Sequence, residues 1–210
     1  MRLRPLLRGW LHQGGFLLLV PIGVLLMVVA DGVAATISAA LFVAGASTML
    51  ACSALYHRVP HREARRRDQY RRVDHAAIYV AILGTYVPVC VVGLPSTWGV
   101  PLLVVVTAGA AGGVICSLID TGPARRIAGV LYIALGWAGI VAFPTLVIES
   151  GWLPVLLLLG GGLAYTAGAI GFALNRPRLW PRVFGYHEVW HAWTLVALAC
   201  HTLAVWQLTS

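Results

Sequence analysis

The sequence is short of charge, and this scarcity excludes a water-soluble domain. Only 10% of the 210 residues are charged and 60% are hydrophobic, whereas about 25% of the residues of a typical soluble domain are charged. A helix needs about 20 apolar residues to cross a bilayer, and runs of this length recur along the whole chain. The composition therefore predicts an integral membrane protein.

Paired cysteines are also lacking. The four cysteines stand apart in apolar stretches and form no CxxC motif. This pattern disfavours a disulfide framework and a thiolate metal site, and it is typical of small buried hydrophobic residues. Long linkers, low-complexity tracts and internal repeats are absent too. We therefore expect residues 1–210 to form a single domain.

Seven hydrophobic runs predict the fold. They lie near residues 15–32, 36–57, 74–94, 99–119, 127–148, 152–174 and 185–208. We therefore expect an all-α fold, an integral membrane seven-helix bundle. A cleaved signal peptide is the alternative for the first run, because arginines precede it and the segment 33–35 has the small residues of a cleavage site. Cleavage would leave six spans.

Lysine is absent, and the fifteen arginines fall in alternate segments. They occupy residues 2–8, 58–72, 125–126 and 176–182, and the other loops and the C-terminal tail carry none. The positive-inside rule then predicts a cytoplasmic N-terminus and an outside C-terminus in the cell's inner (plasma) membrane. Anionic lipid headgroups account for the net charge of +8. No element for recognising nucleic acid accompanies it, so nucleic acid is not an expected partner.

Polar residues of three predicted helices fall at one depth. His57 ends the second run, Asp74 opens the third, and His187 and His191 lie in the first turns of the seventh. Because consecutive spans run in opposite directions, all four side chains are expected just inside the cytoplasmic interface. A carboxylate this close to lipid is costly unless it is paired, so Asp74 is a functional candidate.

The spacing of these residues favours a metal site. Residues four apart share a helix face, as do His187 and His191, and also Ser53 and His57. Three neutral imidazoles would leave the fourth position of a tetrahedral ion open to water, as in a catalytic site. Asp74 could hold that water or orient a ligand.

Other interpretations of the polar residues stay open. The histidines could simply lie at the interface, and Asp74 could pair with Arg71 or Arg72. His201 lies roughly 15 Å deeper along its helix than His191 and should not reach the same ion. The remaining histidines lie in a tail, in the arginine-rich loop and beside Asp74, and we expect them to be solvated or interfacial: His12, His61 and His75.

Three motifs resemble those of a known family. "SALYHR", "DHAAIYVAILGTYVP" and "HEVWHAWTLVALACH" resemble the haemolysin III proteins, bacterial relatives of the progestin and adiponectin receptors. The resemblance implies a seven-helix bundle with the N-terminus inside. It also implies that the metal is zinc, surrounded by the residues at the matching positions: Ser53, His57, Asp74, His187 and His191.

These observations predict a metal-dependent hydrolase for an amide or ester bond of a lipid-like substrate. Asp74 would be the base or would position water, and Ser53 would stabilise the tetrahedral intermediate. A pore-forming cytolysin is an alternative, disfavoured because no helix carries a polar stripe. A receptor-like protein with a structural zinc is a second. A third takes His187-Glu188-x-x-His191 as a protease motif with Glu188 as base, although Glu188 should point about 100° away from His187.

Overall fold

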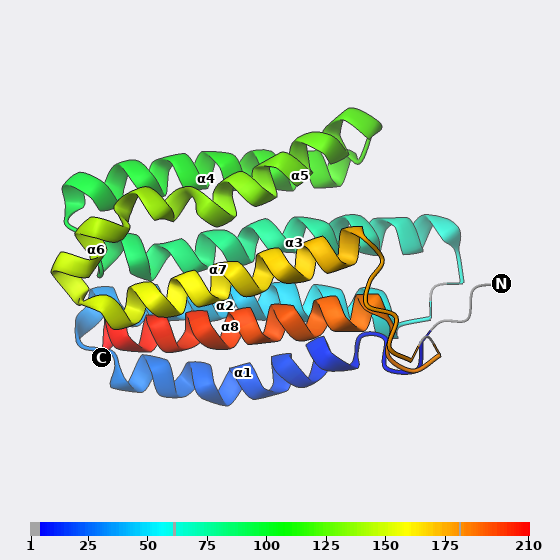
Figure 1. The fold of residues 1–210 in the computed structure, drawn as a ribbon, viewed down its shortest axis with the longest axis horizontal. Helices are drawn as coiled ribbons and strands as arrows, with labels where there is room; N and C mark the ends of the chain where they lie inside the picture. The colour runs from blue at the N-terminus through cyan, green and yellow to red at the C-terminus, as the bar shows by residue number, and fades with distance from the viewer. Residues whose placement is uncertain (1–4, 61, 181) are drawn as a thin grey trace.

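The protein is described by a computed structural model that covers residues 5–60, 62–180 and 182–210 (Figure 1). Its helices are α1 (Trp10–Val29), α2 (Gly32–Arg58), α3 (Ala64–Val91), α4 (Ser96–Ile119), α5 (Gly122–Trp137), the 3-10 helix η1 (Ala138–Ala142), α6 (Phe143–Ser150), α7 (Trp152–Ala173) and α8 (Tyr186–Thr209). Within these described residues, seven helical segments are long and apolar enough to cross a membrane, and α5, η1 and α6 together form one of them. The predicted all-α seven-helix fold is confirmed.

Two helices differ from the predicted spans. α3 begins at Ala64 rather than near residue 74, because the arginine-rich segment before Asp74 is itself helical. Arginine favours helices, and Asp68 forms ion pairs with the arginines three and four residues later, Arg71 and Arg72. The fifth span is also not one regular helix, since η1 interrupts it just before Pro144. Proline has no N–H to continue the hydrogen-bond ladder.

The helices pack mostly against their neighbours in the chain. α2 packs against α1 and α3, α4 against α3 and α5, and α7 against α8. α8 closes the bundle by packing against α1, α2 and α3 as well. α2 and α3 approach very closely, because a Cβ on Gly45 would lie 2.8 Å from the carbonyl oxygen of Val80. Small residues permit such backbone contact between membrane helices.

The arginines that the structure describes lie at one end of the bundle. The N-terminal segment, the α2–α3 and α4–α5 connections and the loop between α7 and α8 lie together at the right of Figure 1, and the C-terminus lies at the left. We call the right-hand end the arginine-rich end. α1 packs against α2 and α8, which favours a retained first span over a cleaved signal peptide.

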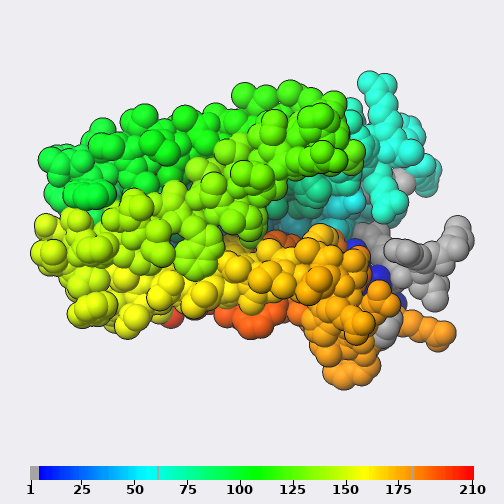
Figure 2. Space-filling view, turned by 45° about the horizontal axis from the view of Figure 1, so that its top comes forward, coloured from blue at the N-terminus to red at the C-terminus, as the bar shows by residue number. Residues whose placement is uncertain are grey.

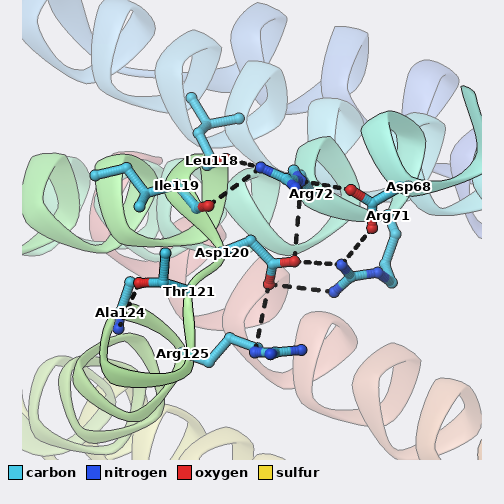
Figure 3. A network of polar contacts seen from close by, with 9 residues as sticks. All are labelled: Asp68, Arg71, Arg72, Leu118, Ile119, Asp120, Thr121, Ala124 and Arg125. Carbon is cyan, nitrogen blue, oxygen red and sulfur yellow. Dashed lines mark hydrogen bonds and ion pairs between the residues drawn. The ribbon is translucent and has the colours of Figure 1, made fainter. Parts of the chain in front are cut away.

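A network of ion pairs fastens the α4–α5 turn to α3 at the arginine-rich end (Figure 3). Asp120 ends α4 in the left-handed conformation, with φ of 56°, and its carboxylate accepts hydrogen bonds from Arg71. Arg72 donates to the carbonyl oxygens of Leu118 and Ile119, the latter at 3.1 Å. Arg71 and Arg72 therefore bind Asp68 and Asp120, and neither forms an ion pair with Asp74 in the structure.

We expect Asp120→Asn to destabilise the protein by about 1 kcal/mol at neutral pH, because the carboxylate loses its charge-assisted bonds with Arg71, whose own side chain is partly exposed. The hydrogen bond from Arg71 lowers the pKa of the Asp120 carboxyl. The stabilisation that the ionised Asp120 gives to the folded protein is therefore fully present above the ordinary pKa of about 3.9. It is lost as the pH falls through the lowered pKa. Thermal unfolding in detergent should show wild type and variant converging in acid. An equal gap at every pH would contradict this account.

Candidate metal centre

Three imidazoles from two helices meet near the arginine-rich end. His57 lies in the last turn of α2, and His187 and His191 lie in the first two turns of α8. One ring nitrogen of each lies within 4.8 Å of the others. The ring centroids are 4.7 Å apart for His57 and His187, 4.7 Å for His187 and His191, and 5.1 Å for His57 and His191. The structure thus brings together the histidines that spacing and depth had selected.

The three nitrogens suit a bound cation. The Nε2 atoms of His57 and His187 face each other at 3.1 Å, close to the roughly 3.3 Å that separates two imidazole nitrogens on a tetrahedral ion with bonds of about 2.0–2.1 Å. The Nδ1 atom of His191 is buried without a hydrogen-bond partner among the described residues. Buried polar atoms are usually paired, and a shared cation would satisfy this cluster.

Asp74 and Ser53 lie beside the histidines. Oδ2 of Asp74 is 3.9 Å from Nε2 of His57, and the Ser53 hydroxyl donates a hydrogen bond to the Asp74 carboxylate. Ser53 lies one helical turn before His57 on α2, so both side chains share the face that turns toward α3. Asp74 is only 13% exposed. The carboxylate is therefore held next to the histidine cluster and not at the surface.

A cavity of about 350 Å³ opens at the cluster. All five of these residues line it, and it continues along α3, α5, α7 and α8 past Tyr132, Trp137 and Tyr165. Figure 2 shows α3 and α8 at the bottom of a hollow between α5 and α7. This hollow follows from the packing, because α5 leans on α4 whereas α7 leans on α8. The histidine cluster thus borders a space large enough for part of a lipid.

His201 and His75, which are outside the cluster, also line the cavity. His201 lines the deeper part of the cavity against Tyr165, with ring centroids 5.7 Å apart, and it is not a member of the cluster. His75 is exposed and lines the cavity next to Asp74. His61 lies outside the described residues. The expectation that it is solvated stays a prediction.

His12 corrects a sequence-based expectation. It is not solvated, because it is only 3% exposed and its ring stacks on that of His191, with centroids 3.8 Å apart and planes at 12°. α1 begins at Trp10 and not near residue 15, so His12 lies inside the bundle. The signal was weak, since a lone histidine after a short arginine-rich tail resembles a surface residue.

Glu188 joins the start of α8 to the N-terminal segment. Its side chain is fully buried, and its carboxylate accepts hydrogen bonds from the guanidinium of Arg8 and the backbone N–H of Gly185, the latter at 2.8 Å. Arg8 belongs to the N-terminal segment, and Gly185 is the residue before α8. The carboxylate is occupied there, which disfavours the protease motif with Glu188 as base.

The fold and the cluster together define a multi-pass membrane protein with a buried histidine centre that could bind a metal ion. The chain matches the family described as "Haemolysin-III related" over residues 2–202, and it belongs to that family.

Three similar proteins agree with this assignment. The chain is 29% identical to "Hemolysin-3 homolog" of Bacillus subtilis (strain 168), over 88% of this chain and 84% of the relative. It is 31% identical to "Hemolysin-3" of Bacillus cereus, over 88% of this chain and 82% of the relative. It is also 28% identical to "Heptahelical transmembrane protein ADIPOR2" of Oryza sativa subsp. japonica, over 79% of each chain. The haemolysin III resemblance is thereby confirmed.

Proposed function

We propose that this protein is a zinc-dependent hydrolase that cleaves an amide or ester bond of a lipid-like substrate. One observation carries the proposal: three imidazoles, two buried and one partly buried, and a carboxylate border a cavity that lies between membrane-spanning helices. His57, His187 and His191 would hold the ion. Bound zinc supplies a Lewis acid for a carbonyl oxygen and lowers the pKa of water.

The chain's own residues have separate roles in this proposal. Asp74 orients the attacking water and accepts its proton, since its carboxylate stands 3.9 Å from the cluster, within reach through one water. Ser53, which hydrogen-bonds Asp74, fixes the direction of the carboxylate. Its predicted contact with the tetrahedral intermediate requires the hydroxyl to turn toward the substrate carbonyl.

The cavity favours a substrate with a long apolar chain. Apolar and aromatic side chains form most of its wall beyond the cluster. The hollow between α5 and α7 opens on the side of the bundle (Figure 2), which would face lipid when the helices span the membrane. An acyl chain can enter from the bilayer there while its polar end reaches the histidines. The arginine-rich end would face the cytoplasm, in the inner (plasma) membrane.

Chelation tests this function. Purified protein in detergent is offered a panel of acyl-amide and acyl-ester lipids, with product measured by mass spectrometry. We expect hydrolysis that a chelator abolishes and added zinc restores, because the ion supplies the Lewis acid. Hydrolysis that persists in metal-free protein would contradict the proposal.

The relatives named Hemolysin-3 favour one competing function, membrane lysis. A lytic protein should release dye from liposomes, and His57→Ala should not change the rate, because no metal chemistry is needed to form a pore. We expect the purified protein to release no dye above the level of protein-free liposomes. Leakage that survives His57→Ala would favour the cytolysin instead.

A further inference from the structure

The N-terminal segment, residues 5–12, is packed against the start of α8. The backbone N–H groups of Leu6 and Leu7 donate to the carbonyl oxygens of Arg182 and Val183, at 3.1 and 3.2 Å. These bonds join two segments that are far apart in the sequence. They place Arg8, in the turn before α1, and His12, in the first turn of α1, opposite the first turns of α8.

Arg8 reaches the turn that carries the histidines. Its guanidinium binds the carboxylate of Glu188, whose side chain is 0% exposed whereas that of Arg8 is 20% exposed. The same carboxylate accepts the N–H of Gly185, the residue before α8. One buried carboxylate therefore joins the N-terminal segment to the first turn of α8. It lies directly after His187 in the chain.

His12 touches the second histidine of α8. The ring of His12 lies flat against the ring of His191, with planes only 12° apart. Neither ring nitrogen of His12 has a hydrogen-bond partner within the described part of the chain. The stacked face is therefore the contact through which His12 can restrain the orientation of His191.

We propose that the N-terminal segment is a positioning element of the metal centre: Arg8 fixes the first turn of α8 through Glu188, and His12 fixes the ring of His191. This inference rests on the metal centre of the proposed function. Ligand rings must be held in one orientation for tight binding, and losing a neighbour that orients a ligand typically lowers metal affinity by about 10–100-fold. Without the segment, the two histidines of α8 in the cluster, His187 and His191, would lose their support.

Two replacements of His12 separate the effect of its stacked ring from the effect of its ring nitrogens. We expect His12→Ala to release zinc roughly 10-fold faster into a chromogenic chelator, because the ring of His191 gains freedom. His12→Phe keeps a flat ring at the same place and should release zinc at about the wild-type rate. The visible spectrum of the cobalt-substituted protein should change in His12→Ala and remain unchanged in His12→Phe.

Replacing Glu188 tests the other contact independently. Arg8 and Gly185 donate to different oxygens of Glu188, and glutamine has only one acceptor oxygen. Glu188→Gln can therefore keep only one of the two bonds, and its zinc release should fall between that of wild type and that of Glu188→Ala. Glu188→Ala removes both bonds and should release zinc roughly 10-fold faster. Gln13→Ala is the matched control, because Gln13 accepts from Arg58 on α2, at 3.1 Å, and does not link the segment to α8.

The outcomes separate this inference from the proposed function, because zinc release is measured without a substrate. Wild-type zinc release in both His12→Ala and Glu188→Ala would overturn the positioning role and leave the metal centre intact. His12→Phe behaving like His12→Ala would also overturn it, since the ring nitrogens and not the stack would then matter. A wild-type protein that takes up no zinc would overturn the positioning role together with the metal centre.

Discussion

Asp74→Asn is expected to lower the turnover number on a lipid amide by roughly 10²–10⁴-fold, the usual contribution of a general base. Asparagine is the same size as aspartate but cannot accept the proton of the attacking water. Asp74 stands outside the cluster of three nitrogens, so bound zinc should remain at the wild-type level. Turnover and zinc content are measured on the same preparation.

A distant carboxylate provides the control for Asp74. Glu149 lies in α6, at the opposite end of the bundle, and is exposed. Glu149→Gln removes one negative charge as well and should leave turnover unchanged. If Asp74→Asn hydrolysed lipid amides as fast as wild type, Asp74 would not be the base. If it lost its zinc, Asp74 would be part of the metal ligation instead.

His191→Ala is expected to lower zinc affinity by more than the roughly 10–100-fold that follows the loss of a residue which only orients a ligand. A tetrahedral ion with three protein ligands loses a third of them. The purified variant should contain almost no zinc by elemental analysis. Hydrolysis should fall with it, even at saturating substrate.

His201→Ala is the matched control, because it removes an imidazole of the same helix and the same cavity. His201 lies beyond the cluster, against Tyr165, and its loss should leave the zinc content unchanged. Equal loss of zinc in both variants would mean that α8 is generally destabilised. Full zinc occupancy in His191→Ala would remove His191 from the ligand set.

Much of the fold could be predicted because the length and hydrophobicity of a run of residues are enough to identify a membrane-spanning helix. The helix ends were harder, because hydropathy marks the apolar core of a span and not the turns that extend beyond lipid. α3 shows this, since its first turns carry the arginine-rich segment and are still helical. In the fifth span, Pro144 indicates where a helix is weakened, but proline alone does not show that the break takes the form of the 3-10 helix η1.

The histidine cluster was within reach of sequence reasoning, because i,i+4 spacing and alternating span direction fix both face and depth. The same logic could not find the contribution of the N-terminal segment. His12 stacks on His191 and Arg8 binds Glu188 only because α1 packs beside α8. A hydropathy pattern does not show which helices are neighbours in the bundle. Glu188 shows this limit of sequence reasoning most clearly. Its place in a protease-like motif suggests a catalytic base, but its carboxylate binds the N-terminal segment to the start of α8.

X-ray absorption at the zinc edge, together with the zinc content of the purified protein, tests the central claim most directly. We predict one zinc per chain, with imidazole nitrogens at about 2.0–2.1 Å and one oxygen ligand in the remaining position. A protein that is purified without a divalent metal and takes up no zinc when it is offered would contradict the claim that His57, His187 and His191 share an ion.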